Sequence, residues 1–276
     1  MMLGMVGEFF AVFLTINPQS PPRQNGVLMP EIAESAVAIL ENDEAVSVAT
    51  AEKVDTETKV ILPFEYSADE HYYIESLGEI KKKPFYSFVK RVFDIVACSI
   101  GLVLLALPML VIAIAIKATS PGPVFYRQER LGLNGKKFML VKFRSMVNDA
   151  EKHGAKWSDG DNDSRITKVG SILRKTRLDE IPQLWTCVTG QLSLIGPRPE
   201  REIFYDAFEE HVHGFRERLK VKPGLTGLAQ VSGGYDLRPE EKVLYDIEYI
   251  KNRSLWLEIK ILFKTVAVVL GHKGAK

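Results

Sequence analysis

The chain has 276 residues, a net charge of +1 and an apolar fraction of 46%, which are ordinary values for a folded protein. The length suits one large domain or two small ones, and bulk composition alone gives no sign of a membrane protein. The two cysteines lack metal-site spacing, which argues against a disulfide-stapled fold and favours a reducing compartment.

Charge is distributed unevenly along the chain. Residues 31–80 hold thirteen Asp or Glu against two Lys, a local balance of −11. Since residues 1–30 are balanced, residues 81–276 carry +12. We predict an acidic, flexible extension over residues 1–80, with at most one or two short elements. The second unit, residues 81–276, is basic enough for a phosphate-rich ligand or an anionic membrane surface; a merely solvated positive face is the alternative.

The segment IVACSIGLVLLALPMLVIAIAI, residues 95–116, carries no charge. As a helix at ~1.5 Å per residue it would measure about 33 Å, enough for a bilayer core. Lys and Arg flank it on both sides, so both ends favour the cytoplasmic side. Pro108 removes an amide donor near its middle and bends the helix. We predict a re-entrant membrane helix over about residues 91–117 that bends at Pro108; a straight span and a buried helix of a soluble domain are the alternatives.

Residues 120–146 are typical of a β-hairpin. Two strands, residues 124–126 and 138–143, flank a turn at LNGK. Basic side chains on or beside the strands could cradle a phosphate, because guanidinium groups offer forked donors to phosphate oxygens. These candidates are Arg127, Arg130, Lys142 and Arg144. A basic hairpin facing lipid headgroups is an alternative compatible with the first.

The stretch TRLDEIPQLW places two carboxylates, Asp179 and Glu180, between two predicted helices. The first helix covers about residues 171–177, and the second starts near Pro182, because proline is tolerated in a first helical turn. Amide dipoles at a helix N-terminus stabilise anions and should depress the pKa of both carboxylates. One carboxylate could then act as a nucleophile and the other could hold Mg²⁺; plain helix capping is the alternative explanation.

The stretch GQLSLIGPRPE, residues 190–200, presents Arg198 rigidly between Pro197 and Pro199, which suits a diphosphate. We expect Gly190 and Gly196 to let a ligand approach the backbone closely. A lone surface turn would have the same pattern.

Residues 254–270 form an amphipathic helix near the C-terminus. Such a helix could lie in a membrane interface with Trp256 at headgroup level, or pack as an ordinary core helix.

Four of these stretches together resemble the bacterial sugar transferases, the monotopic phosphoglycosyl transferases that start glycan assembly on undecaprenyl phosphate. They are, in order, KRVFDIVACSIGLVLLALP, SPGPVFYRQERLGLNGKKFMLVKFRSM, RITKVGSILRKTRLDEIPQLWTCVTGQLSLIGPRP and VKPGLTGLAQVSG, within residues 88–270. The ending YDIEYIKNRSLWLEIKILFKTV is similar to hexose-1-phosphate transferases of exopolysaccharide and capsule pathways. The resemblance implies a mainly helical α+β fold: a membrane-associated monotopic domain with a re-entrant, proline-broken helix, a small β-hairpin and interfacial amphipathic helices.

The resemblance also implies roles for the matching residues. Asp179 is the nucleophile on the β-phosphate of the sugar nucleotide, and Glu180 is the Mg²⁺ ligand. Contacts to the nucleotide and its phosphates are implied for Arg174, for the turn of Pro197, Arg198 and Pro199, and for the Lys-Phe-Arg stretch from Lys142 to Arg144. Pro108 is the helix-breaking proline, although Leu107 precedes it where members often have Ser.

The implied activity transfers a sugar-1-phosphate from a UDP-sugar to undecaprenyl phosphate and releases UMP through a sugar-phosphoryl-aspartate; a direct single displacement is the competing mechanism. Glucose or galactose fits the C-terminal resemblance best, and N-acetylated sugars stay open. This would be the first membrane step of exopolysaccharide, capsule or O-antigen synthesis, at the cytoplasmic face of the bacterial inner membrane.

The expected partners are a UDP-sugar, undecaprenyl phosphate and the lipid bilayer, with no nucleic acid. A second copy of the chain and downstream glycosyltransferases are left open as partners. A non-catalytic membrane adaptor of a glycan-assembly complex is the rival function, but it gives no reason for the carboxylate pair and the arginines to occur together.

Overall fold

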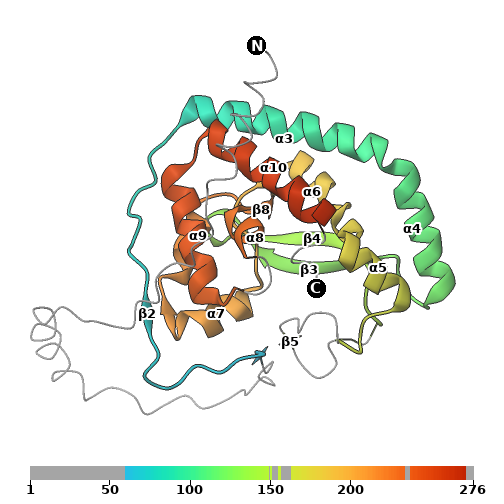
Figure 1. Ribbon diagram of the computed structural model, residues 1–276, viewed down its shortest axis with the longest axis horizontal. Helices are drawn as coiled ribbons and strands as arrows, with labels where there is room; N and C mark the ends of the chain where they lie inside the picture. The colour runs from blue at the N-terminus through green and yellow to red at the C-terminus, as the bar shows by residue number, and fades with distance from the viewer. Residues whose placement is uncertain (1–59, 149, 151–154, 157–162, 234–236, 272–276) are drawn as a thin grey trace, which may run out of the picture.

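In a computed structural model, the structure describes residues 60–148, 150, 155–156, 163–233 and 237–271. The elements in chain order are β1 (Val60–Ile61), β2 (Tyr72–Tyr73), α3 (Pro84–Leu104), α4 (Ala106–Thr119), β3 (Phe125–Leu131), η1 (Leu133–Gly135), β4 (Lys137–Phe143), β5 (Ala155–Lys156), α5 (Lys168–Thr176), η3 (Leu178–Glu180), α6 (Gln183–Thr189), β6 (Ser193–Ile195), α7 (Glu202–Glu209), β7 (Val212–His213), η4 (Phe215–Lys220), β8 (Gly224–Thr226), α8 (Leu228–Ser232), α9 (Pro239–Asn252) and α10 (Leu255–Gly271). Helices predominate, and the strands of the described residues form four two-stranded sheets (Figure 1). The predicted mainly helical α+β fold is confirmed.

The long apolar segment forms two helices that meet at an angle. α3 ends at Leu104, α4 begins at Ala106, and the bend between them is 59°. Among the described helices, none alone has the length and apolar composition of a membrane span, but the bent pair has both. Pro108 explains where the bend lies, because a proline clashes with the carbonyl four residues earlier, here that of Leu104, and offers it no N–H. The predicted bend is therefore present, but one turn before Pro108 instead of at it.

The inner face of α3 is polar and is fastened to the rest of the domain. Asp94 is buried and accepts hydrogen bonds from Ser193 Oγ at 2.7 Å and from the amide of Leu194 at 3.1 Å. Lys90 donates to the carbonyl of Ile195 at 2.9 Å. In Figure 1, α3 and α4 run along the top and side of the molecule and curve around the β3–β4 hairpin. The two helices are thus part of the domain's own packing.

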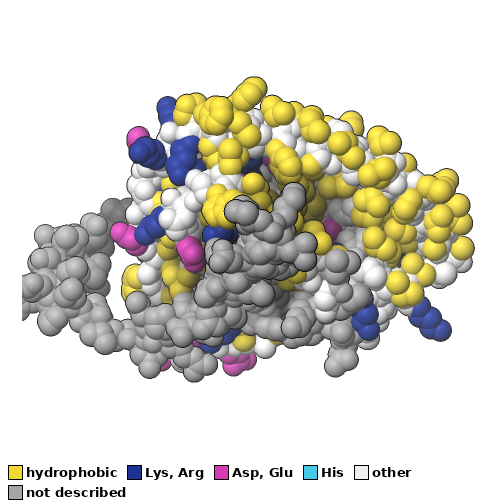
Figure 2. Space-filling model, turned by 45° about the horizontal axis from the view of Figure 1, so that its top comes forward, with side chains coloured by type: hydrophobic (Ala, Val, Ile, Leu, Met, Phe, Trp, Pro, Cys, Tyr) yellow, Lys and Arg dark blue, Asp and Glu magenta, His cyan; other side chains and the backbone are white. Residues whose placement is uncertain are grey.

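The outer faces of α3, α4 and α10 are apolar and exposed, and Figure 2 shows much of this surface as a yellow layer. Its large members include Phe85, Phe88, Phe93, Val96, Ile100, Val103, Leu107, Leu110, Val111 and Ile114 on α3 and α4, and Trp256, Ile259, Phe263 and Val266 on α10. On its inner face, α10 buries Glu258 and Ile261. This helix therefore packs as a core helix on one side and presents an apolar surface on the other.

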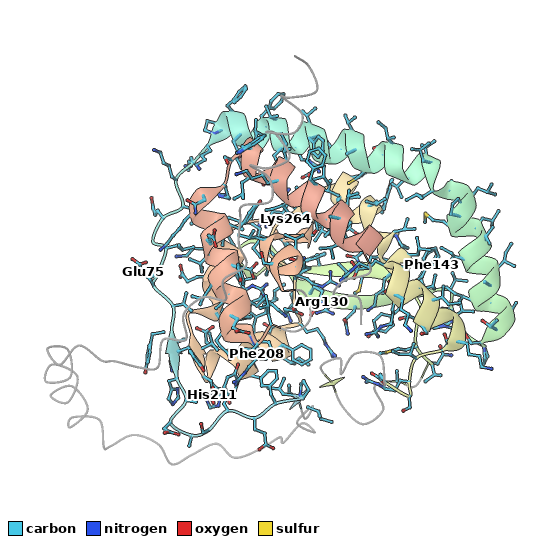
Figure 3. The ribbon with its side chains drawn as sticks, in the orientation of Figure 1. Glu75, Arg130, Phe143, Phe208, His211 and Lys264 are labelled. Carbon is cyan, nitrogen blue, oxygen red and sulfur yellow. The ribbon has the colours of Figure 1, made fainter. Side chains whose placement is uncertain are left out.

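The predicted hairpin is confirmed, with a first strand longer than expected. β3 and β4 pair antiparallel from Phe125 opposite Phe143 to Leu131 opposite Lys137. Phe143 is buried with residues of α4 and α5, whereas Phe208 belongs to a larger apolar cluster that joins α7, η4, α9 and α10 (Figure 3). Leu131, at the end of β3, belongs to the larger cluster and Phe143, at the end of β4, to the smaller one, so the hairpin connects the two.

The described end of the predicted acidic extension is folded onto the domain. We name residues 60–80 the N-terminal strap; its strands β1 and β2 pair parallel with β5 and β7. Apolar strap residues pack against the large cluster: Val60, Leu62, Phe64, Tyr66, Tyr72, Ile74, Leu77 and Ile80. His211, labelled in Figure 3, stacks on Tyr66 at 4.5 Å and on His71 at 5.5 Å between ring centroids. The prediction for residues 1–80 allowed one or two short elements, and β1 and β2 agree with it. From residue 60 onward, however, the chain is packed on the domain, because these side chains bury apolar surface. Residues 1–59 lie outside the described residues.

Candidate active site

A cavity of about 490 Å³ opens between the hairpin, the α5–η3 segment, the loop after β6, and helices α8 and α9. Among the described residues, nine basic side chains line it against three carboxylates, an excess of six positive charges. The basic residues are Arg130, Lys142, Arg144, Arg165, Arg174, Arg177, Arg198, Arg201 and Lys242, and the carboxylates are Asp179, Glu180 and Glu200. Such a field concentrates anionic ligands, and phosphates most of all.

A sharp turn after α5 places the carboxylate pair in this cavity. Arg177 ends α5 in the left-handed conformation, with φ 56°, which is uncommon for a residue other than glycine. The single turn η3 follows with Asp179 and Glu180, and α6 begins only at Gln183. The first predicted helix, α5, starts at residue 168 instead of 171. The carboxylate pair lies about one turn before the second helix, α6.

Asp179 is 6% exposed, and its environment opposes its ionisation. Burial and the neighbouring charge of Glu180 raise its pKa to about 6, although Lys142, Arg174 and Arg198 act in the opposite direction. The depressed pKa predicted for Asp179 from a helix N-terminus is therefore wrong, because the side chain is buried beside a like charge. Near neutral pH the group is ionised but only weakly solvated, a state suited to a nucleophile.

Glu180 is held by an arginine. Arg198 Nη1 donates to Glu180 Oε2 at 3.3 Å, and Arg198 Nη2 forms an ion pair with Oε1. Burial alone would raise the pKa of Glu180, but Arg198, with Arg177 and Lys142, outweighs burial and holds the pKa below its ordinary value. The two adjacent carboxylates thus have pKa values shifted in opposite directions, which is typical of groups with different chemical roles.

Lys142 is the cation of the hairpin that acts on Asp179. Burial lowers the pKa of Lys142 to about 8, although the charge of Asp179 raises it. Its Nζ lies 5.5 Å from the ring centroid of Tyr126. A desolvated ammonium at this place can compensate negative charge that builds up near Asp179.

The structure brings most of the predicted site residues together around the cavity. Those that line it are Asp179, Glu180, Arg174, Lys142, Arg130, Arg144 and Arg198. Arg130, labelled in Figure 3, forms an ion pair with Glu200 at 3.0 Å. Arg144 has a further structural task, because its guanidinium donates to the carbonyls of Ser120 and Pro121 and so holds the chain after α4.

Three predicted residues have other positions. Arg127 is exposed on β3 and is not among the described residues that line the cavity. Pro197 and Pro199 flank Arg198 without lining the cavity themselves, as far as the described residues show. Their part is to fix the backbone on both sides of Arg198, since proline restricts φ and the residue before it.

The two glycines expected to approach a ligand approach other parts of the chain. A Cβ atom on Gly196 would lie 2.6 Å from the carbonyl oxygen of Lys222 and 2.9 Å from the amide of Gly224, so β6 and β8 need a glycine there. Gly190 ends α6 with φ 92°, and its Cβ would lie 3.0 Å from the guanidinium of Arg91. The structure thus gives both glycines a role in chain packing, and neither is among the described residues that line the cavity.

Several cavity residues were missed by the sequence reasoning: Arg165, Arg177, Glu200, Arg201 and Lys242. Glu200 and Arg201 directly follow the proline-framed arginine, so the extended motif could have indicated them. Lys242 is buried on α9, and its Nζ lies 3.9 Å from Glu200 Oε1. No local motif marks Lys242; only the packing of α9 brings it to the site.

The donor set suits a magnesium ion that arrives with a substrate. Among the described residues, no group of three or more His, Cys, Asp or Glu is placed to hold a metal. Of the three described carboxylates that line the cavity, two are adjacent in the chain, Asp179 and Glu180. Mg²⁺ is commonly bound by one or two carboxylates together with substrate phosphates and water, so these residues fit such an ion.

Comparisons with known proteins show the family of the chain. The profile of the family described as bacterial sugar transferase matches residues 85–272. The UDP-N-acetylgalactosamine-undecaprenyl-phosphate N-acetylgalactosaminephosphotransferase of Aeromonas hydrophila is 42% identical over 210 residues, 75% of this chain and 49% of that protein. The UDP-glucose:undecaprenyl-phosphate glucose-1-phosphate transferase of Xanthomonas campestris pv. campestris is 40% identical over 205 residues, 72% and 42% of the two chains.

A third relative is similar in length to the matched part. The exopolysaccharide production protein ExoY of Rhizobium meliloti is 35% identical over 224 residues, 76% of this chain and 97% of that protein. The chain spans less than half the length of the Aeromonas and Xanthomonas relatives. Since the family profile covers well over half of the chain, including the carboxylate pair and the proline-framed arginine, the chain belongs to the bacterial sugar transferase family.

Proposed function

We propose that the protein transfers a sugar-1-phosphate from a UDP-sugar to undecaprenyl phosphate and releases UMP. The observation that carries this proposal is Asp179, a buried carboxylate with a pKa of about 6 in a cavity whose described lining residues carry six excess positive charges. A diphosphate substrate suits such a cavity. The names of the relatives support the same pair of substrates, and the ExoY relative supports a place in exopolysaccharide production.

The reaction runs in two displacements. The Asp179 carboxylate attacks the β-phosphorus of the UDP-sugar, the bond from that phosphorus to the bridging oxygen breaks, and UMP leaves with the electron pair. A phosphate oxygen of undecaprenyl phosphate then attacks the phosphorus of the sugar-phosphoryl-aspartate, which frees the carboxylate and gives a diphosphate-linked sugar. Negative charge develops on the phosphoryl oxygens in both steps, and Arg174, Arg198 and Lys142 are positioned to stabilise it.

A magnesium ion would assist from the same site. Glu180 would hold it together with the diphosphate of the substrate, and the ion would neutralise charge on the phosphate oxygens. Arg198, which pairs with Glu180, keeps that carboxylate ionised and therefore able to bind a cation.

The apolar outer faces support a place for the protein on the cytoplasmic leaflet of the bacterial inner membrane. α3 and α4 would enter the leaflet and return, and α10 would lie in the interface with Trp256, 47% exposed, near the headgroups. A lipid-linked phosphate acceptor lies at the same boundary. A soluble nucleotide and a membrane-bound phosphate would meet in the cavity.

The sugar is proposed to be glucose or galactose, on the resemblance of the C-terminal end. The Aeromonas relative, named for N-acetylgalactosamine, makes the N-acetylated sugars the necessary comparison. A panel of UDP-glucose, UDP-galactose, UDP-N-acetylglucosamine and UDP-N-acetylgalactosamine, each with undecaprenyl phosphate, would rank them by the ratio of kcat to KM. A higher ratio for either N-acetylated sugar would contradict the proposed preference.

The covalent route is tested without the lipid acceptor. Purified protein with Mg²⁺ and a UDP-sugar labelled in its β-phosphate should release about one UMP per active site and retain the label, and Asp179→Asn should do neither. Release of UMP only when undecaprenyl phosphate is present, with no labelled protein, would exclude the covalent route in favour of a single displacement. No transfer under any condition, together with intact recruitment of other glycan enzymes by Asp179→Asn, would favour the adaptor.

A further inference from the structure

Hydrogen bonds to successive carbonyl oxygens fix the backbone around Arg198. Four successive carbonyl oxygens, from residue 197 to residue 200, each accept a hydrogen bond from a different part of the chain. The carbonyl of Pro197 accepts from the amide of Gly224 at 2.9 Å, that of Arg198 from Arg218 Nη2 at 3.0 Å, that of Pro199 from Arg130 Nη1 at 3.4 Å, and that of Glu200 from the amide of Leu131 at 3.0 Å. Only two of the four donors are side chains, and one of these, Arg218, lies deep in the core.

Arg218 is 1% exposed and is paired with Asp246, which is also 1% exposed. Its Nε donates to Asp246 Oδ2 at 2.8 Å, and its Nη2 lies 2.5 Å from the same oxygen. The guanidinium lies 4.8 Å from the ring centroid of Phe215 and 5.8 Å from that of Tyr205. This environment fixes the direction of the guanidinium and therefore the position of the carbonyl that it holds.

The burial of this ion pair is by itself unfavourable for the stability of the fold. Removing two charges from water is unfavourable, and their mutual attraction offsets this only where hydrogen bonds satisfy the remaining polar atoms. Here Arg218 Nη1 and Asp246 Oδ1 are buried and lack a hydrogen-bond partner within the part of the chain that the structure describes. An apolar pair of similar size would fill the same space at lower cost, so the position of this pair points to a task beyond packing.

The task follows from the residue that Arg218 holds. Arg198 pairs with Glu180 in the cavity, whereas neither Arg218 nor Asp246 is among the described residues that line the cavity. The prolines on both sides leave the backbone at Arg198 few conformations. The hydrogen bond from Arg218 to the carbonyl of Arg198 therefore fixes the direction in which the Arg198 side chain points. The line of contacts runs from Asp246 through Arg218 and Arg198 to Glu180.

We propose that Arg218 and Asp246 are positioning residues that direct the Arg198 guanidinium onto Glu180 and the phosphates of the substrate. This inference rests on the proposed function. The ion pair of Arg218 and Asp246 then affects the reaction only by orienting Arg198. Removing the pair should therefore change turnover only while the Arg198 side chain is present.

A double-mutant cycle tests this dependence. The first variant combines Arg218→Met with Asp246→Leu, which replaces the ion pair by apolar residues of similar size and so preserves the fold. We expect its kcat for UMP release to fall about 100-fold, as for other losses of alignment at a distance from the reacting atoms. In the Arg198→Ala background the same two substitutions should lower the rate no further. A labelled UDP-sugar keeps slow variants measurable, and the affinity for UDP, read by calorimetry in all four proteins, should show the same non-additivity.

The control removes an exposed ion pair from the same region of the domain. Arg216→Gln with Asp206→Asn breaks the pair between η4 and α7 and should leave kcat unchanged. Equal losses in both Arg198 backgrounds, or wild-type kcat in the folded double variant, would overturn the proposal. If the double variant does not fold, Asp246→Asn, which preserves shape, decides by the same cycle; if that variant also fails to fold, the pair is structural and the proposal is overturned. A wild-type protein without transfer activity would instead overturn the proposed function.

Discussion

Arg91 on α3 donates a hydrogen bond from Nη1 to the carbonyl of Cys187 on α6 at 2.7 Å, and its Nη2 donates to the next carbonyl, that of Val188, at the same distance. These carbonyls belong to the C-terminal end of α6, where backbone acceptors lack partners within the helix. Since α6 begins three residues after Glu180, Arg91 connects the bent apolar helices to the segment that carries the carboxylate pair. The site and the proposed membrane element share a rigid contact.

Replacing Arg91 by Met should destabilise the protein. Hydrogen bonds from a charged donor contribute about 1.5–3 kcal/mol, and the substitution leaves the end of α6 without these donors. The free energy of unfolding, measured with denaturant in a fixed detergent, should fall by about that amount. The exposed Lys82→Met is the matched control and should change it by less than about 0.5 kcal/mol. Equal free energies of unfolding for the two variants would show that the hydrogen bonds of Arg91 do not stabilise the protein.

The rate of UMP release should rise with pH, reach half of its maximum near pH 6 and level off about one unit higher. Asp179 attacks only when ionised, and its pKa of about 6 places the midpoint of the acid limb there. The charge of Lys142 lowers the pKa of Asp179, so Lys142→Gln should move the midpoint to higher pH. Lys137→Gln, at an exposed ion pair of the same strand, should leave it in place. The measurement is the single-turnover rate constant of UMP release against pH in the absence of lipid, and a midpoint near 4 in the wild type would contradict the role of burial.

Asp179→Asn should stabilise the protein while it removes activity. The pKa of Asp179 is about 6 in the folded protein against an ordinary value of 3.8, so the folded state binds the proton more readily than the unfolded state. Stability is therefore lost as the pH rises from about 4 to about 6, and it stays low above that window. Asn resembles the protonated form, and its gain should reach on the order of 3 kcal/mol at pH 7.5 and shrink towards pH 4.5.

Denaturant unfolding at the two pH values measures this gain, with the exposed Asp69→Asn as the control. A destabilised Asp179→Asn at pH 7.5 would mean that the surrounding cations stabilise the ionised carboxylate more than burial disfavours it.

Pro108→Ala should straighten the α3–α4 pair. The alanine supplies an N–H for the carbonyl of Leu104 and removes the ring that clashes with it, so one continuous helix becomes favourable. In inner-membrane vesicles, cysteines introduced at positions 82 and 117 should both react from the cytoplasmic side in the parent protein, and the second should lose that reactivity after Pro108→Ala. Pro84→Ala, at the first position of α3, should not change the pattern. Unchanged labelling of position 117 would show that contacts of α4 with the domain, and not the proline, set the bend.

Tyr66→Phe should loosen the N-terminal strap. The hydroxyl of Tyr66 donates to Glu240 Oε2 at 2.8 Å, and its ring lies 4.9 Å from the Arg238 guanidinium. Loss of the hydroxyl leaves a partly buried carboxylate with one donor fewer, at a cost of about 1–2 kcal/mol. Hydrogen exchange should speed up at the β2–β7 amides, where residues 72 and 74 donate to residues 211 and 213. Tyr73→Phe, at a side chain 77% exposed, is the control; equal exchange in both variants would contradict the anchoring role of Tyr66.

Local patterns predicted the hairpin, the carboxylate pair and the presence of the bend. They misplaced the bend, because the clash of Pro108 acts on the carbonyl of Leu104, one turn earlier. They also assigned residues 60–80 to a flexible tail on the strength of acidic composition. The spacing by two of Phe64 with Tyr66 and of Tyr72 with Ile74 was the overlooked signal of extended chain with one buried face.

Long-range packing determined what the sequence could not indicate. The raised pKa of Asp179 depends on burial under the hairpin, and the placement of Lys142 depends on strand pairing over residues 125–143. Glu200 and Lys242 meet because the loop after β6 and α9 adjoin the same cavity. A motif shows the residue types and their spacing along one segment. The charged side chains that line this cavity come from five segments, and only the folded chain brings them together.

The inward polar face of α3 has a practical consequence for handling the protein. Lys90 donates hydrogen bonds to β6 and α10, and Asp94 accepts them from β6. Cutting away residues 84–119 in search of a water-soluble fragment would therefore leave Glu258 and the hydroxyl of Ser193 without those partners. Purification and crystallisation should therefore retain residues 84–119 and cover their exposed apolar side chains with a mild detergent or a nanodisc.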